Sequence, residues 1–429
     1  MRIVMNYGKK GLPIDIPEGI EVDVIRKKDM PVIGEPEEAV RSAIENPVGC
    51  DNLQEIIKDG TKICILVCDV TRPVPHGVIL PVLIKALINA GARPELITIL
   101  IATGLHRPNE GDELRELIGD DWIMQTVKVE NHYAKRDEDH VFLGTTPRGM
   151  QVKLDRRFVD ADMRIAVGLV EPHFMAGYSG GRKLIVPGVS HHETIRALHS
   201  ARMLNSENVN NCIIEGNPLH EEQIVVVKMV GGALALNTVI DEGRRLCFVN
   251  FGEIEKSHLD AVSFARPFFE IPVKQKYRTI ITSAAGYPLD RYFYQTIKGM
   301  LGVIDILETG GDLFIVSECS EGLGSEEYIE SQRKLQGVGV DRFMEEASRN
   351  VYASIDEWGP VMQIKVMKIG TIHLYSECLT AEEKALTCVR VCDSISDSIK
   401  DSVEVKGDHL IAVIPEGPYV IPVYRPDCT

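Results

Sequence analysis

The sequence of 429 residues has no uninterrupted run of eighteen apolar residues, so it offers no candidate for a membrane-spanning helix. Its first ten residues, MRIVMNYGKK, lack the apolar core of a signal peptide. None of the ten cysteines forms a C-x-x-C pair, which argues against a zinc knuckle or a thioredoxin-like redox motif. We therefore expect a soluble cytoplasmic protein with reduced, partly buried cysteines.

Positive charge is also scarce, since 47 Lys and Arg residues face 63 Asp and Glu residues and give a net charge of −16. Such a surface repels nucleic acid and has no polybasic patch for a membrane, so we expect neither as a partner. A small anionic ligand would need a site with its own arginine, lysine or backbone N–H groups. The hydrophobic fraction of 44% is ordinary for a globular protein, and the length is sufficient for two domains.

The hydrophobic pattern predicts an α/β protein. Continuous apolar runs at 62–68, 95–102 and 163–170 are typical of buried parallel strands. A second α/β unit begins near residue 273. We predict two domains, 1–270 and 271–429, each a mainly parallel sheet flanked by helices, with the active site in the cleft between them.

Several further elements are predicted from periodicity and from helix-ending residues. A strand is expected at 2–7, followed by an irregular segment at 11–52 with one helix at 36–45, and a small β excursion is expected at 126–158. The remaining predicted helices are 76–90, 110–118, 218–229, 253–270, 290–301, 325–336, 340–348, 358–369, 380–387 and 392–400, and the remaining strands are 233–240, 245–250, 277–283, 312–317, 371–375 and 409–414.

Polar side chains follow three of the predicted strands at the point where each ends. Asp69 and Arg72 follow the first, His106 follows the second and His173 follows the third. Ligands of open α/β sheets bind outside the carboxyl ends of the strands. If these strands are parallel neighbours, the sequence predicts one site that contains all four side chains.

The stretch 168–199 carries the densest set of functional residue types. After His173 come three glycines, then Arg182 and Lys183, then a helix expected near Ser190. Glycines and a helix N-terminus let backbone N–H groups approach an anion. The pattern is not the P-loop G-x-x-x-x-G-K-[ST].

Three histidines lie in or near the helix that follows. His199 comes eight residues after His191 and seven after His192, about two helical turns away. No H-x-x-x-H or H-x-H pair occurs here, so a conventional three-histidine metal site is not indicated. His191 and His192 are expected to be solvated residues at the helix start.

These segments resemble the lactate racemase family of nickel-pincer-nucleotide enzymes. The resemblance rests on DVTRPVP at 69–75, ATGLHRP at 102–108, the stretch 168–199 and QTIK at 295–298, with Trp358 and Gln363 as a fainter fifth element. The motifs cover most of the chain and keep the family's order. The resemblance implies a racemase or epimerase of lactate or a related 2-hydroxy acid.

The resemblance also implies roles for individual residues. Lys183 would be tethered through a thioamide to the cofactor, a pyridinium mononucleotide with two sulfur groups that holds Ni(II), and His199 would complete the square plane around the nickel, a geometry that suits Ni(II). His106 and His173 would be the acid and base in proton-coupled hydride transfer. The other implied cofactor contacts are Thr71, Arg72, Gly180, Gly181, Arg182 and Trp358, and the implied substrate contacts are Asp69, Arg72, Tyr294, Gln295 and Lys298.

The implied partners are therefore a small 2-hydroxy acid and the enzymes that make the cofactor. Two other hypotheses remain open. Lys183 could act as a Schiff-base or general-base lysine on an anionic small molecule. Alternatively, the chain could be a non-catalytic module that binds nickel or a nucleotide.

Overall fold

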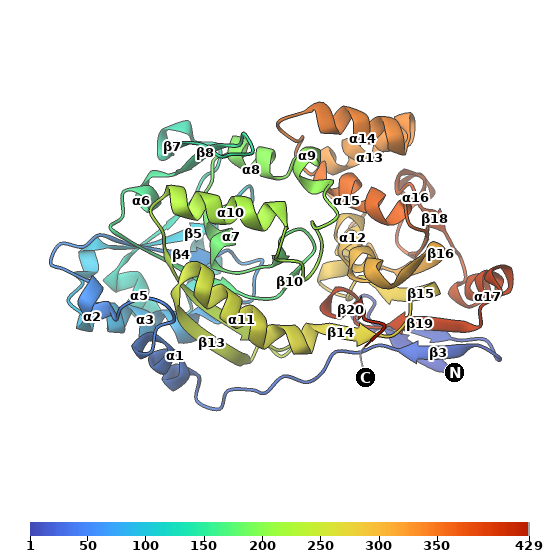
Figure 1. Ribbon diagram of the computed structural model, residues 1–429, viewed down its shortest axis with the longest axis horizontal. Helices are drawn as coiled ribbons and strands as arrows, with labels where there is room; N and C mark the ends of the chain where they lie inside the picture. Colours follow the sequence, from blue (N-terminus) through green and yellow to red (C-terminus); the bar gives the residue numbers. More distant parts are fainter. Residues whose placement is uncertain (428–429) are drawn as a thin grey trace.

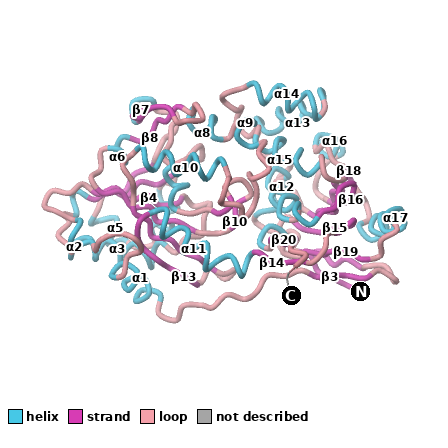
Figure 2. Tube along the Cα trace, viewed as in Figure 1, coloured by secondary structure: helices cyan, strands magenta, loops and turns pink. Residues whose placement is uncertain are grey.

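The computed structural model describes residues 1–427 and contains two sheets that lie side by side, each flanked by helices (Figures 1 and 2). The first sheet has six strands in the order β13-β12-β9-β4-β5-β6. All neighbours are parallel except β12 and β13. The strands are β4 (Ile63–Cys68), β5 (Ile97–Ala102), β6 (Lys128–Asn131), β9 (Met163–Leu169), β12 (Leu234–Ile240) and β13 (Leu246–Glu253).

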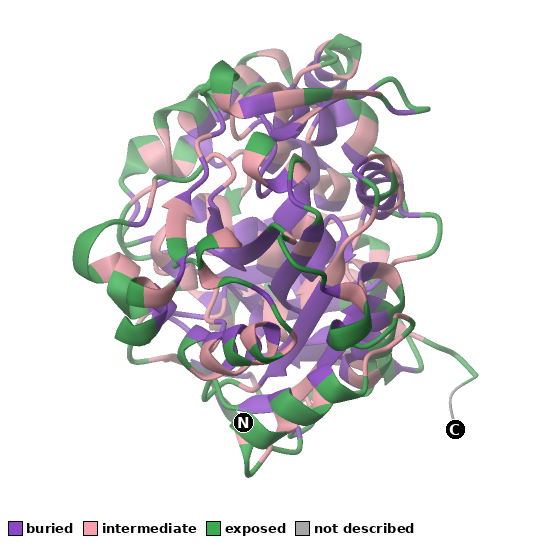
Figure 3. Cartoon of the chain, turned by 90° about the vertical axis from the view of Figure 1, so that its left-hand side faces the viewer, coloured by how far each residue is buried: buried purple, intermediate pink, exposed green. Residues whose placement is uncertain are grey.

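All six residues of β4 are buried. Figure 3 shows buried strands in the middle of the molecule with more exposed helices around them. A strand that is covered on both faces needs apolar residues throughout, which explains the continuous run KICILVC. The helices form two groups. In one group, α3 packs with α1, α4 and α5. In the other, α7 packs against strand β9 and contacts α10 and α11. The helices are α1 (Pro36–Glu45), α2 (Leu53–Ile56), α3 (His76–Asn89), α4 (Gly111–Ile118), α5 (Asp121–Thr126), α6 (Arg156–Val159), α7 (Gly181–Ile185), α8 (His192–Leu198), α9 (Ala201–Leu204), α10 (Pro218–Met229) and α11 (Ile254–Phe269).

The second sheet has the order β18-β17-β16-β15-β19-β3 and is parallel throughout. Its strands are β3 (Glu21–Val24), β15 (Tyr277–Ser283), β16 (Leu307–Val316), β17 (Thr371–Tyr375), β18 (Arg390–Val391) and β19 (Leu410–Ile414). Its helices are α12 (Phe293–Gly302), α13 (Glu326–Val338), α14 (Val340–Arg349), α15 (Trp358–Met367), α16 (Ala381–Leu386) and α17 (Ile395–Lys406). The predicted α/β class with two mainly parallel sheets is confirmed.

The N-terminal segment belongs to the second sheet, which differs from the expected division at residue 270. Strand β3 pairs with β19, and the hairpin of β1 (Arg2–Met5) and β2 (Leu12–Asp15) packs its apolar face against that sheet. In Figure 1 these blue strands lie beside red C-terminal elements. The segment 11–52 therefore contains two strands that were predicted to be irregular, whereas the helix at 36–45 is confirmed.

Three other predictions needed correction. The segment 126–158 is not one β excursion, because β6 extends the main sheet and only β7 (His140–Thr145) and β8 (Gln151–Asp155) form a separate hairpin. The helix expected at 290–301 is interrupted before Phe293, and the helix expected at 392–400 begins and ends later, at Ile395–Lys406. Two short pairs complete the fold, β10 (Pro172–His173) with β11 (Gly177–Tyr178), and β14 (Glu270–Val273) with β20 (Ile421–Tyr424).

The cysteines within residues 1–427 are free, and most are buried, as expected for reduced structural thiols. Cys428 lies outside the described residues. In this part of the chain no helix combines the length and the apolar character that a membrane crossing requires.

Candidate active site

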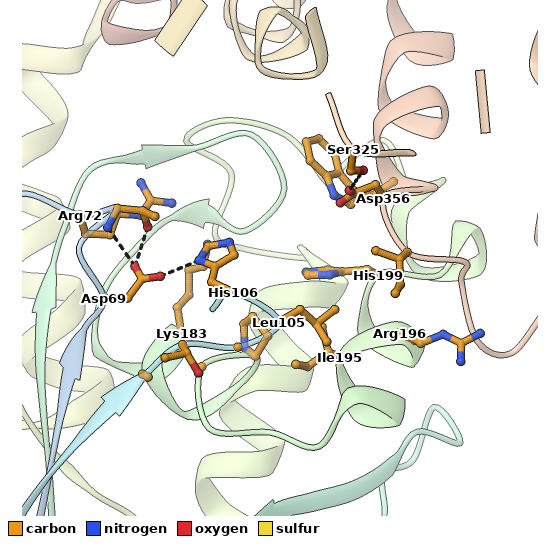
Figure 4. Close-up of a pocket in the computed structure, with 18 of the residues that line it drawn as sticks. Asp69, Arg72, Leu105, His106, Lys183, Ile195, Arg196, His199, Ser325 and Asp356 are labelled. Atoms are coloured by element: carbon orange, nitrogen blue, oxygen red, sulfur yellow. Dashed lines mark hydrogen bonds and ion pairs between the residues drawn. The ribbon is translucent and has the colours of Figure 1, made fainter. Parts of the chain in front are cut away.

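A cavity of about 730 Å³ is lined by strand ends, loops and helices of the first domain and by loops and helix residues of the second (Figure 4). The last residues of three neighbouring strands, Cys68 of β4, Ala102 of β5 and Leu169 of β9, reach its wall. The predicted convergence of strand ends is thus present. Of the residues singled out from the sequence, the cavity is lined by Asp69, Thr71, Arg72, His106, Gly180, Lys183, His199, Tyr294 and Trp358.

Lys183 sits on a short helix that approaches the sheet very closely. A Cβ at Gly168 would lie 2.7 Å from the Gly181 backbone nitrogen, and a Cβ at Gly181 would lie 3.0 Å from the Ala235 Cβ. Gly180, which precedes the helix, has a φ of +133° that side-chain-bearing residues rarely adopt. Glycine at these positions therefore allows α7 to lie against β9 and to present Lys183 to the cavity.

The Lys183 amine lies in an environment that disfavours its charge. Burial lowers its pKa well below the ordinary value for lysine, and the charges of Arg72, Arg182 and Lys298 lower it further. A lowered pKa increases the fraction of the neutral amine, which is the nucleophilic form of lysine.

His199 enters the cavity from the end of α8, and in Figure 4 its ring points toward the space between His106 and Lys183. Burial lowers its pKa to about 4, and the charge of Lys183 adds to this effect. The imidazole is therefore neutral, which is the form that binds a metal ion. The His199 N–H bonds to the Ile195 carbonyl at 3.0 Å and fixes the backbone at this position.

His106 is oriented by Asp69. The His106 Nδ1 lies 2.6 Å from Asp69 Oδ2, and Thr71 Oγ1 donates to Asp69 Oδ1 at 2.5 Å. Burial opposes ionisation of Asp69, but the hydrogen bonds from His106 and Thr71 outweigh it and lower the pKa of the carboxyl group. An ionised Asp69 holds the proton of His106 on Nδ1, so that Nε2 is free to accept a proton.

His173 has the opposite arrangement. Its Nδ1 accepts hydrogen bonds from the backbone N–H groups of Met175 and Ala176, both at 3.2 Å. The proton of the neutral ring is therefore on Nε2. Burial lowers the pKa of His173 well below its ordinary value, and the charges of Lys183 and Arg72 lower it further. His173 is beside the cavity but is not one of its lining residues.

Arg72 of the first domain lines the cavity, whereas Gln295 and Lys298 of α12, which were expected to contact the substrate, are not among its lining residues. Arg72 is paired with Glu171 at 2.5 Å, and Lys298 extends from α12 to within 5.9 Å of the centre of the Phe174 ring. Burial lowers the pKa of Lys298 to about 7, and the charge of Arg72 contributes to the shift. Gln295, one turn earlier on the same helix, has a buried Oε1 with no hydrogen-bond partner among residues 1–427.

Four rings, each in contact with the next, extend from His173 in the first domain to Tyr294 in the second. The ring of His173 stacks on Phe174 at 4.9 Å, Phe174 lies 5.2 Å from Trp358, and Trp358 lies 5.2 Å from Tyr294. Trp358 and Tyr294 thus close the cavity from the second domain.

Arg182 does not contribute to the cavity, contrary to the expectation of a cofactor contact. Its fully buried guanidinium donates to the carbonyls of Ala176, Tyr178 and Ser179 at 2.8–3.3 Å and lies 2.5 Å from His258 Nε2. It stabilises the loop before Lys183. Gly181 likewise contacts the sheet and does not line the cavity, and Gln363 is buried in the second domain, where it bonds to Gln332.

Several residues near the cavity were missed. Glu171, the counter-charge of Arg72, stands two residues before His173, and the need to neutralise a strand-end arginine was a signal for it. Asp356 and Ser325 line the second-domain side and bond to each other at 2.6 Å. They lie in loops without a sequence signal. His191 was expected to be solvated, but it is buried and caps α8 by accepting from the Glu193 N–H.

Two family models together match most of the chain. The family model described as the lactate racemase N-terminal domain matches residues 7–211, and that of the lactate racemase C-terminal domain matches residues 273–422. The chain belongs to the lactate racemase family.

Two curated relatives are named lactate racemase. The protein of Thermoanaerobacterium thermosaccharolyticum is 34% identical over 326 residues, which is 76% of each chain, and that of Lactiplantibacillus plantarum is 32% identical over 290 residues, which is 68% of each chain. Racemases are isomerases, so the predicted enzyme class is confirmed.

Solved structures agree in fold. The lactate racemase apoprotein of T. thermosaccharolyticum superposes with a TM-score of 0.89 at 29% identity and covers 98% of this chain and 100% of its own. A Thermotoga maritima protein from a structural genomics consortium has a TM-score of 0.66 at 17% identity, with 91% and 99% covered, and shares the fold.

Proposed function

We propose that this protein racemises lactate or a closely related 2-hydroxy acid, with a nickel-pincer nucleotide tethered at Lys183. The observation that supports the proposal most directly is the environment of Lys183, an amine whose charged form is disfavoured by burial, on the wall of a cavity that also contains His199. The names of both curated relatives support lactate as the substrate.

The residues of the cavity fit such a cofactor. A volume of about 730 Å³ is within the range of cavities that hold small ligands and cofactors. Lys183 supplies an amine that can form an amide-type bond, and His199 supplies one neutral imidazole for a metal ion. When bound, the nickel-pincer nucleotide would supply a hydride acceptor.

The carboxylate of the substrate would be held by cations from both domains. Arg72 comes from the first domain and Lys298 from the second, with Gln295 on the same helix face as Lys298. A carboxylate held at two points fixes the orientation of the neighbouring carbon and its hydroxyl group. Phe174, Trp358 and Tyr294 exclude water from this side.

The two histidines would handle the hydroxyl proton. His106 Nε2 is a free acceptor because Asp69 holds the proton on Nδ1, so His106 can take the hydroxyl proton of one enantiomer. His173 presents Nε2–H in this arrangement and can donate a hydrogen bond to the oxygen from another direction. For His173 to act as the base, its ring proton must move from Nε2 to Nδ1, which breaks the two backbone hydrogen bonds to Nδ1.

The test is racemisation of pure L-lactate and pure D-lactate by enzyme co-produced with the cofactor-making enzymes, followed by chiral chromatography. We expect conversion in both directions, and a loss of about 10²–10⁴-fold in His106→Ala and in His173→Ala. Turnover that survives in both variants would contradict the acid–base assignment. No turnover by loaded wild-type protein would redirect the search to other 2-hydroxy acids.

A second function has one observation in its favour. A buried lysine with a lowered pKa is also what a Schiff-base enzyme requires, so Lys183 could react with a carbonyl substrate. Borohydride in the presence of a 2-ketoacid would then add mass irreversibly at Lys183. A cofactor adduct on the same nitrogen excludes this chemistry.

A further inference from the structure

A cluster of potential metal ligands lies outside the cavity, at the opposite end of α8 from His199. Asp137, His191 and His192 each place one ligand atom within 4.8 Å of the others. Asp137 comes from the short turn at Asp137–Asp139, and the two histidines come from the start of α8, so the chelate joins two separate segments of chain.

The backbone holds both histidines in place independently of any ion. The His191 N–H donates to the Lys153 carbonyl at 3.0 Å, and the His192 N–H donates to the Ala134 carbonyl at 2.9 Å. The side chain of His191 is buried, and its Nε2 faces Asp137 Oδ1 at 2.7 Å. A rigid frame of this kind lowers the entropic cost of bringing three ligands together.

Glu193 lies beside the ring nitrogen of His191 that would not bind the metal, where a carboxylate can accept the N–H of the imidazole. Its Oε2 lies 3.5 Å from His191 Nδ1. In this structure Nδ1 accepts a long hydrogen bond of 3.3 Å from the Glu193 N–H. When a cation takes the lone pair of Nε2, the ring proton moves to Nδ1 and can be donated to Glu193. This carboxylate–histidine–metal order is common in metal sites and makes the imidazole a better ligand.

Acidic partners offset part of the positive charge around the cluster. Lys153 is paired with Glu193 at 2.6 Å, and Arg136 lies 4.0 Å from Asp139. Arg196 and Lys135, which line a hollow together with His192, are the cations that a bound ion would face. Asp137 is exposed, so an ion can enter from solvent. Two imidazoles and one carboxylate leave a fourth tetrahedral position open for water, a set of donors that suits Zn²⁺.

We propose that Asp137, His191 and His192 bind one Zn²⁺ ion at a site separate from the cofactor centre. His192 also lines a second hollow, which shares the lining residues Leu105 and Arg196 with the main cavity. The bound ion would therefore lie beside the main cavity and not within it. The proposal does not depend on the proposed racemase activity.

The test uses untagged, chelator-treated protein produced without the cofactor-making enzymes, titrated with ZnCl₂ by calorimetry and with CoCl₂ by visible absorption. We expect one equivalent of Zn²⁺ and a tetrahedral Co²⁺ spectrum. Asp137→Ala and His192→Ala, both at accessible positions, should weaken binding at least 100-fold, and Glu193→Gln should weaken it about 10–100-fold. His199→Ala should bind as wild type does.

Three outcomes would overturn the proposal. They are no saturable binding by wild type, binding that is unchanged in Asp137→Ala and His192→Ala, and binding that is lost in His199→Ala, which would place the ion in the cofactor centre. Circular dichroism of each variant separates loss of a ligand from loss of the fold.

Discussion

At the scale of single residues, the two histidines of the candidate site differ in which ring nitrogen is available. Asp69 fixes the His106 proton on Nδ1, whereas backbone N–H groups occupy Nδ1 of His173. The neutral ring of His106 therefore carries its proton on Nδ1, and that of His173 carries it on Nε2. Asp69 influences the chemistry by orienting His106. From the sequence, Asp69 was expected either to contact the substrate or to orient Arg72 or a histidine, and its hydrogen bond to His106 favours the orienting role.

Asp69→Asn should lower the rate of racemisation by about 10²–10⁴-fold. The amide introduced by this substitution can donate to Nδ1 of His106, which moves the ring proton to Nε2 and removes the base. Because the equilibrium constant between enantiomers is one, kcat/KM must fall equally in both directions. Initial rates from each enantiomer check this, with intact mass to confirm equal cofactor content. An effect on KM alone would contradict the orienting role.

Lys298 should make substrate capture sensitive to pH. Its pKa of about 7 means that the ammonium group is present below pH 7 and is lost as the pH rises through that value. Attraction for the substrate carboxylate is lost with it, so kcat/KM should decline over a pH series that brackets 7. Lys298→Arg keeps its charge at every pH in the series and should abolish this decline. The same decline in both proteins would assign the titration to another group.

Strand-end motifs carry a family pattern, and nine of the residues singled out from the sequence line the cavity. Five others do not line it, namely His173, Gly181, Arg182, Gln295 and Lys298. For Arg182 and Gly181, adjacency to Lys183 does not say which way a side chain points. The φ of Gly180 and the contact between β9 and α7 turn Lys183 to the cavity and Arg182 to the carbonyls behind it. Glu171 was missed because pairing with Arg72 depends on a contact across 99 residues.

At the scale of elements, the position of Lys183 depends on close contact between β9 and α7. Gly168→Ala would place a Cβ 2.7 Å from the Gly181 nitrogen and 2.9 Å from the Gly180 carbonyl carbon. Backbone cannot yield as a flexible side chain does, so we expect a loss of about 1–3 kcal/mol in the free energy of unfolding. Urea denaturation measures it.

Gly34→Ala is the matched control, since a Cβ there meets nothing within 4 Å. Equal stability of the two variants would show that α7 does not need this contact.

Helices and buried strands with strong periodicity were predicted well, whereas short edge strands were not. Strand β3 has only four residues, none of them fully buried, so its hydrophobic pattern was too weak to find. The break between η3 (Leu289–Arg291) and α12 was missed because the Phe293 N–H donates to the Gly322 carbonyl at 3.0 Å, a contact that the local sequence does not reveal.

At the scale of the whole molecule, the chain starts in one sheet, crosses to the other and returns. The hairpin β1–β2 and strand β3 complete the second sheet, so the N-terminal residues should stabilise the C-terminal domain. The two tryptophans separate the domains, because Trp122 lies in the first and Trp358 in the second. In a Trp122→Phe background, tryptophan fluorescence comes from Trp358 alone, which belongs to the second domain and also contacts Phe174 of the first.

Met5→Ala in that background should lower the stability of the second domain by about 2–5 kcal/mol, since Met5 is fully buried against this sheet. Val4→Ala, at a position that is 57% exposed, serves as the control. If Met5→Ala leaves the unfolding transition measured by Trp358 fluorescence unchanged, the assignment of the hairpin to the second domain is contradicted.

The central claim is the tether at Lys183, and intact mass combined with nickel analysis tests it most directly. The protein is co-produced with the cofactor-making enzymes as wild type, as Lys183→Ala and as Lys135→Ala, a second lysine that lines the cavity. We predict an added mass and bound nickel in wild type and in Lys135→Ala, and neither at the cofactor centre of Lys183→Ala. An unmodified wild type, under conditions that load a known member of the family, would contradict the account.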